Sequence, residues 1–394
     1  MTGRRRVRRT SAAALCLLLA APACGGPVTD PELAGVQRLL DRRAAAVLGH
    51  DRAAYARTGA PAGFDALGAV PLAAWSYRVT RLERDGDAAT AEADLRYRVE
   101  GYDPGAVTAR RTVRLVRDVG GRWSVAGERP APGAGEQPWD QGEVRAVRGE
   151  RGLVLGVGRG AGELRGLADL ADRAVPAVSD AWGEDWPRRV VVLVPRSLED
   201  MARLLGSPPS AYRDIAAVTT GVTGGREPAP ADRIIVNPEA YALLGDRGRQ
   251  VVLTHETAHV ATRHATTAAT PLWLSEGYAD WAAYRGGPSA PAEAAPELAR
   301  AVREGRAPVR LPADGDFGPD GGPRATARAY EGGWLACRMI ADRWGEDRLD
   351  AFYRAVGAHG HREGAVAEAL DTVLGTTPER FTRDWTQYLR ASLA

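Results

Sequence analysis

The 394-residue sequence contains no lysine, only three cysteines and few aromatic residues (6%). All 52 basic residues are therefore arginine, and 50 acidic residues nearly balance them, which leaves a formal net charge of +2. This balance gives no electrostatic case for nucleic acid as a partner. Abundant Arg, Ala and Gly are typical of a GC-rich bacterial genome, such as an actinobacterial one.

Long hydrophobic runs are also scarce, and the clearest one lies near the N-terminus. Five arginines between positions 4 and 9 precede an apolar run over 12–23, which is too short to span a bilayer. This pattern predicts a secretory signal peptide over 1–24. The stretch Ala21-Pro22-Ala23-Cys24 resembles a bacterial lipobox, although Ala21 stands where leucine is usual. We expect lipidation of Cys24 and an extracytoplasmic, membrane-anchored protein; simple cleavage and secretion is the alternative.

The cysteine count predicts a mature chain without disulfides. Cys16 leaves with the signal peptide and Cys24 carries the lipid, so Cys337 has no partner. Its apolar, helical surroundings predict a buried, inert thiol.

Two domains are expected after the signal. Helical spacing over 30–50 precedes segments that alternate at period two, namely 76–79, 91–99, 112–117 and 122–125. One helix followed by a curved antiparallel sheet resembles the cystatin-like, nuclear-transport-factor-like cone, here over 30–128. A Pro/Gly-rich linker is predicted over 129–141.

The second domain, 142–394, is predicted to begin with strands and end with helices, an α+β layout. Strands are expected at 153–156, 190–194 and 233–236. Helices are expected over 164–182, 247–264, 271–284, 291–304, 325–344, 346–357, 363–373 and 377–392. The glycine-rich stretch 155–162 is interpreted as a turn and not as a dinucleotide fingerprint, because position 161 is Ala and parallel βαβ crossovers are not expected.

The strongest chemical signal is His255-Glu256-x-x-His259 within an apolar helical stretch. Residues four apart share one helix face, so both imidazoles are placed to bind one zinc ion. Glu256 lies beside them, where its carboxylate reaches a metal-bound water as a general base.

A second pair of polar residues follows seventeen positions later. Glu276 and Asp280 are four apart on another apolar helix, beside Trp273, Tyr278 and Trp281. Two buried carboxylates are costly without partners. A zinc ion and a ligand histidine would remove that cost.

Together these two helices resemble the gluzincin metallopeptidases, most closely the class called peptidase MA-like. The resemblance implies a zincin-like fold over 142–394, with His255, His259 and Glu276 as Zn²⁺ ligands and Glu256 as the base. It also implies that Asp280 accepts the other ring N–H of a ligand histidine, His255 being expected.

The resemblance implies further roles as well. Tyr330, on a late helix, is expected to stabilise the oxyanion, and packing near the site is its alternative role; His359 or His361 is a further candidate donor. An edge strand beside the ligand helix pairs with substrate in this fold, and 233–237 is the sequence candidate. The Gly-Ala-Met-Glu-Asn stretch of related aminopeptidases is absent, so their specificity is not carried over.

The expected function is zinc-dependent hydrolysis of a peptide or protein substrate, endopeptidase-like, at the outer face of the membrane. Two alternatives remain open. One is a zinc-binding surface lipoprotein without catalytic activity. The other is a lipoprotein that carries a ligand in its N-terminal cone.

Overall fold

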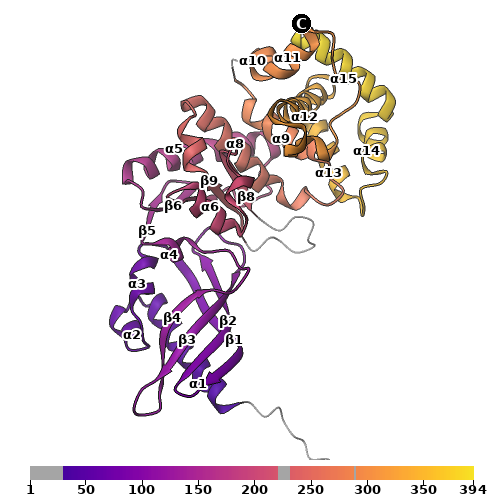
Figure 1. Ribbon diagram of the computed structural model, residues 1–394. Coiled ribbons are helices and arrows are strands. Elements are labelled where there is room, and N and C mark those ends of the chain that lie inside the picture. Colours follow the sequence, from indigo (N-terminus) through magenta and orange to yellow (C-terminus); the bar gives the residue numbers. More distant parts are fainter. Residues whose placement is uncertain (1–29, 221–230, 288–289) are drawn as a thin grey trace, which may run out of the picture.

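The computed structural model describes residues 30–220, 231–287 and 290–394, so the predicted signal peptide and Cys24 lie outside the described residues. The chain runs from an antiparallel sheet, through a second sheet, into a helical part (Figure 1). No helix within the described ranges is both long and apolar enough to cross a membrane.

The N-terminal part consists of helices and one four-stranded antiparallel sheet in the order β1-β2-β3-β4. Its elements are α1 (Pro31–Leu48), α2 (Arg52–Ala56), α3 (Ala62–Leu67), β1 (Leu72–Asp85), β2 (Ala88–Val99), β3 (Val107–Arg117) and β4 (Trp123–Pro130). Alternate strand residues are buried beneath α1, as the period-two pattern predicts. The predicted helix and strands are present, and the likeness to a cystatin-like cone stays a prediction.

The segment 129–141 is packed against the protein and is not a free tether. It contains the last residues of β4 and all of α4 (Pro138–Gln141). Glu136 donates its backbone N–H to the carbonyl of Arg203 on α6 (Leu198–Leu205), and the Gln141 amide donates to the carbonyl of Asp200. The composition predicted a Pro/Gly-rich linker here, and Pro and Gly also suit tight, well-packed connections of this kind.

The second sheet has five strands in the order β5-β6-β7-β9-β8. They are β5 (Val144–Arg148), β6 (Gly152–Val157), β7 (Val190–Val194), β8 (Ala217–Thr220) and β9 (Arg233–Val236). The three inner strands are parallel, and both outer strands are antiparallel to them.

This topology corrects two sequence-based expectations. The helix α5 (Ala161–Trp182) connects β6 to β7 as a parallel crossover, which the sequence analysis had not expected. The strand at 233–236 is not an edge strand, because β9 lies between β7 and β8 and is buried throughout. Strand order in a sheet depends on contacts between distant segments, which local patterns do not report.

The second sheet is covered on both faces. Leu153, Leu193 and Ile235 share one hydrophobic core with the N-terminal part. Val154, Val192 and Ile234 point to the opposite face and share a core with α5 and the later helices. The sheet therefore joins the two halves of the molecule.

The regular elements described after β9 are all helical, as predicted for everything after Arg247. The main helices are α7 (Pro238–Ala242), α8 (Asp246–Thr262), α9 (Leu272–Tyr284), α10 (Pro291–Ala294), α11 (Pro296–Arg303), α12 (Pro323–Trp344), α13 (Glu346–Ala358), α14 (Ala365–Leu374) and α15 (Pro378–Leu393). The single helix predicted over 291–304 is split by Pro296, because proline disfavours helical geometry in the residue before it. Cys337 is fully buried on α12, and burial raises the pKa of its thiol well above its usual range, as expected of an inert thiol.

Candidate metal centre

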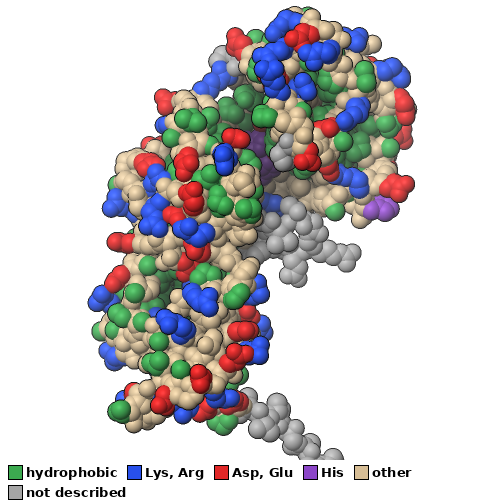
Figure 2. Space-filling model, viewed as in Figure 1, with side chains coloured by type: hydrophobic (Ala, Val, Ile, Leu, Met, Phe, Trp, Pro, Cys, Tyr) green, Lys and Arg blue, Asp and Glu red, His purple; other side chains and the backbone are tan. Residues whose placement is uncertain are grey.

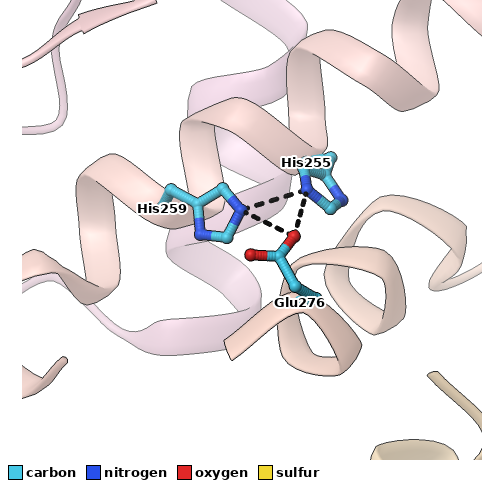
Figure 3. Close-up of side chains that lie close together, drawn as sticks. All are labelled: His255, His259 and Glu276. Atoms are coloured by element: carbon cyan, nitrogen blue, oxygen red, sulfur yellow. Dashed lines mark hydrogen bonds and ion pairs between the residues drawn. The ribbon is translucent and has the colours of Figure 1, made fainter. Parts of the chain in front are cut away.

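Two helices place a His/His/Glu cluster at the hollow between the sheet-containing and helical parts. His255 and His259 lie one turn apart on α8, and Glu276 comes from the second turn of α9 (Figure 3). One ligand atom from each lies within 4.8 Å of the others. Histidine surface is visible at the floor of the hollow in Figure 2.

The separations between these atoms fit one small tetrahedral cation. Nε2 of His255 and Nε2 of His259 are 3.0 Å apart, and Oε2 of Glu276 lies 3.3 and 3.4 Å from them. Two atoms bound to one tetrahedral zinc at about 2.0–2.1 Å lie about 3.3 Å from each other. Two nitrogens and one carboxylate oxygen are also a ligand set that zinc accepts, with its fourth position left open. The residues present therefore fit zinc.

Asp280 forms a hydrogen bond with His255 on the side of the imidazole that faces away from the cluster. Its Oδ1 lies 2.8 Å from Nδ1 of His255. An N–H at Nδ1 that donates to this carboxylate leaves the lone pair at Nε2 facing the cluster. Asp280 is therefore at the position expected for it from the sequence.

The cluster carries an excess of negative charge. Burial lowers the pKa of His255, but the carboxylates of Asp280 and Glu276 outweigh burial and raise it well above its ordinary value. Burial likewise opposes the ionisation of Glu276, yet the imidazoles of His259 and His255 lower its pKa. Both shifts express one mutual attraction, because the carboxylates favour a charged imidazole and the imidazoles favour an ionised Glu276.

Glu256 lies next to the cluster on the side of the second sheet. It is only 6% exposed. Its Oε2 accepts a hydrogen bond of 2.6 Å from the hydroxyl of Thr219 on β8. The sequence analysis did not identify Thr219, because a threonine in a four-residue strand carries no distinguishing signal.

A close helix crossing forms the other side of the site. A Cβ on Gly277 would lie 2.3 Å from the carbonyl carbon of Gly333, and one on Gly333 would lie 2.6 Å from the carbonyl oxygen of Trp273. Backbone contact between α9 and α12 thus requires glycine at both positions. This contact brings Tyr330, one turn before Gly333, towards the cluster.

Tyr330 is half-buried with its ring against Phe317, at a centroid distance of 5.0 Å. Burial, followed by the carboxylates of Glu276, Asp280 and Glu256, raises the pKa of its phenol. The hydroxyl therefore remains protonated as a hydrogen-bond donor.

The other histidines of the helical part lie elsewhere. His264 is exposed, as expected. Nδ1 of His359 lies 3.1 Å from Nδ1 of His361, and Nε2 of His359 lies 3.3 Å from a carboxylate oxygen of Glu368. The contacts of the described residues thus place neither histidine in the cluster.

Comparison with known proteins gives distant structural neighbours. No protein-family model matches the chain, and no curated protein matches it. Among solved structures, it is similar to a mutant M1 zinc metallopeptidase from Deinococcus radiodurans, with 17% identity, a TM-score of 0.37, and coverage of 79% of this chain and 61% of that one.

A structure of the same mutant enzyme bound to a Tyr-Ser-Ala substrate gives 18% identity, a TM-score of 0.34, and coverage of 79% and 60%. A two-domain M1 zinc metallopeptidase mutant bound to L-arginine gives 17% identity and a TM-score of 0.37, with coverage of 79% of this chain and 62% of that one. The chain thus spans about three fifths of the length of these structures. Such scores are too low to carry a functional argument, so the function proposed below rests on the side-chain arrangement.

Proposed function

We propose that this protein is a zinc-dependent peptidase whose metal ligands are His255, His259 and Glu276. The observation that carries the proposal is the near-tetrahedral spacing of these three ligand atoms, with Asp280 bonded to the far nitrogen of His255. Zinc, when bound by this set, supplies a Lewis acid that acidifies a water molecule and polarises the scissile carbonyl.

The chain's own residues supply the remaining chemistry. Glu256 accepts the proton of the attacking water and returns it to the leaving amine. The phenol of Tyr330 donates a hydrogen bond to the oxyanion that develops during attack. Asp280 keeps His255 in the tautomer that presents Nε2 to the cluster.

Substrate binding is assigned to β8 in place of the strand predicted from the sequence. Within the described residues, β8 is one of the two outer strands of the second sheet, and it packs on α8. Its outer edge, which pairs with no other described strand, offers N–H and C=O groups to an extended peptide. This pairing suits cleavage within a peptide chain, the endopeptidase-like activity that we propose.

A location outside the cytoplasm also belongs to the proposal, by way of Cys24 and the signal-like segment over 1–24. A diacylglyceryl adduct on Cys24, measured by mass spectrometry of the mature protein, tests the membrane anchor. A mature chain cut elsewhere, with no adduct, rejects it.

The ligand-carrier alternative finds little support in the N-terminal part. The face of its sheet near α4 is filled by Trp139, whose ring centroid lies 5.2 Å from that of Trp75 and 5.0 Å from that of Tyr97. All three rings are buried. These three contacting rings form part of a packed core on this face.

The deciding experiment compares the mature protein with Glu256→Gln. Both proteins should bind one equivalent of zinc, and only the parent should cleave a peptide library, with a loss of about 10²-fold or more in the variant. A parent that binds zinc but cleaves nothing would instead support the non-catalytic zinc-binding protein.

A further inference from the structure

The carboxylate of Glu256 has one hydrogen-bonding side-chain partner among the described residues, the hydroxyl of Thr219. The same hydroxyl lies 3.0 Å from the backbone carbonyl oxygen of Glu256. The Thr219 hydroxyl thus contacts both the side-chain carboxylate and the backbone carbonyl of Glu256. This double contact limits the rotation of the threonine and of the glutamate.

The cost of losing this contact follows from burial. Glu256 is 6% exposed, so water cannot readily replace a missing donor. A carboxylate without its hydrogen bond would leave the position set by Thr219. A base displaced by about 1 Å from the proton it must accept can slow a reaction by about 10²-fold.

The strand that carries Thr219 is itself held in place. Thr219 pairs with Ile234 on β9. The next residue before Ile234, Arg233, forms a two-pronged ion pair with Asp103, with N–O distances of 2.7 and 2.8 Å. Asp103 belongs to the N-terminal part and is nearly fully buried, so this pair fixes β9 against that part.

A second ion pair links the same strand to the ligand helix. Asp232, directly before β9, accepts a hydrogen bond of 2.8 Å from Arg263 at the end of α8. Asp232 and Arg233 are adjacent in sequence, and they form ion pairs with two different parts of the molecule. The β8–β9 pair is thus fastened between the N-terminal part and the helix of His255 and His259.

We propose that Thr219 is the positioning residue for Glu256, and that the Asp103–Arg233 pair fixes the strand that carries it. The proposal rests on the proposed function, in which Glu256 is the base. It gives the N-terminal part a role in catalysis through the sheet, without any contact between that part and the substrate.

The first test compares Thr219→Val with Thr219→Ser. Valine keeps the shape and loses the hydroxyl, whereas serine keeps the hydroxyl. With zinc content equal to that of the parent, valine should lower kcat by about 10- to 100-fold and leave KM nearly unchanged. Serine should restore most of kcat. Equal kcat in the parent and Thr219→Val would overturn the proposal.

The second test uses metal-free protein and needs no activity. Thr219→Val should lower Tm by about 2–5 °C, because Glu256 is left buried without a donor. In a Glu256→Ala background the same substitution should have a clearly smaller effect, because only the contact with the backbone carbonyl oxygen of residue 256 is left to lose. Equal shifts in both backgrounds would show that Thr219 acts without Glu256 and would overturn the proposal.

The third test concerns the N-terminal part. Asp103→Asn should lower kcat in the parent but add little in the Thr219→Val background, because both changes act through one strand. Asp65→Asn, which weakens an exposed ion pair with Arg52 in the same part, is the matched control and should leave kcat unchanged. Independent, multiplying effects of Asp103→Asn and Thr219→Val would refute the link through the strand.

These tests separate the two proposals. A parent without hydrolytic activity rejects the peptidase, while the Tm comparison still tests the bond between Thr219 and Glu256. An active parent with an unaffected Thr219→Val variant rejects the positioning role alone.

Discussion

Two regions of this molecule each gather several buried or half-buried carboxylates, and the two regions differ in the cations around them. Where the N-terminal part meets the second sheet, each carboxylate faces a guanidinium. Arg111 binds Glu128 and Asp140, and Arg233 binds Asp103. Arginine is charged at every relevant pH, so this junction has its positive charge permanently built in.

The metal centre is the opposite case. Glu256, Glu276 and Asp280 are gathered around two imidazoles, and no arginine in the described part of the chain lies within ion-pair distance of them. The sequence contains 52 arginines, so their absence from this site does not reflect a low arginine content. An imidazole binds a metal ion in its neutral form, and with both imidazoles neutral these carboxylates lack the cation that a divalent metal ion would supply. One region is therefore closed, and the other is suited to bind such an ion.

The largest effect should come from removing a ligand. His259→Ala leaves one imidazole and one carboxylate, too few for tight binding, so zinc content should fall from about one equivalent to near zero, and activity with it. Metal analysis after dialysis measures this. His264→Ala, at an exposed histidine just after the same helix, is the control and should keep its zinc.

Breaking the junction should destabilise the protein without emptying the metal site. Arg111 is 3% exposed at its side chain, so Arg111→Met leaves two carboxylates without their cation and should cost about 3–5 kcal/mol in the free energy of unfolding. Urea denaturation gives the value. Arg52→Met removes an exposed pair and should cost less than about 1 kcal/mol. Loss of zinc from folded Arg111→Met would contradict the separation of the two regions.

A smaller effect, on zinc affinity, is expected from changing Asp280, which contacts a ligand histidine and is not itself a ligand. Asp280→Asn keeps the size of the side chain but removes the carboxylate that orients His255, and zinc affinity should fall by about 10- to 100-fold. Competition with a chelator of known affinity measures the change. Unaltered affinity would show that backbone packing alone orients the imidazole.

The smallest effect concerns a buried carboxylate that belongs to neither region. Glu331 accepts hydrogen bonds from the backbone amides of Glu297 and Leu298, yet burial raises its pKa to about 7 from a usual 4.5. The folded state therefore holds a proton that the unfolded chain has lost between these values. Stability should therefore fall progressively as the pH rises from about 4.5 to about 7.

Glu331→Gln should remove this part of the pH dependence, as urea denaturation at several pH values would show. The exposed Glu83→Gln serves as the control and should keep the parent's slope. If Glu331→Gln retained that slope as well, other groups would be responsible.

The sequence predicted what depends on local spacing. His255 and His259 share a helix face because they are four apart, and the apolar residues around Glu276 and Asp280 indicated a second buried helix. Most helix bounds in the second half agree with the structure to within a few residues.

What the sequence did not predict depends on contacts between distant segments. The short strand β8 has no long alternating pattern, so it was missed, and the equally short but more apolar and fully buried β9 was taken for the edge. Thr219 could not be singled out before β8 was placed beside α8. The shared core of the two halves was hidden for the same reason, since strands buried on both faces show no alternation.

The glycine contact between α9 and α12 has a consequence for motion. Helices that touch through their backbones slide against each other only with difficulty, so Glu276 and Tyr330 belong to one stiff unit. Thr219 lies on β8 of the second sheet and is not part of this helical unit. When the hollow widens to admit a peptide, we expect the distance from Thr219 to Tyr330 to change while that from Glu276 to Tyr330 stays constant.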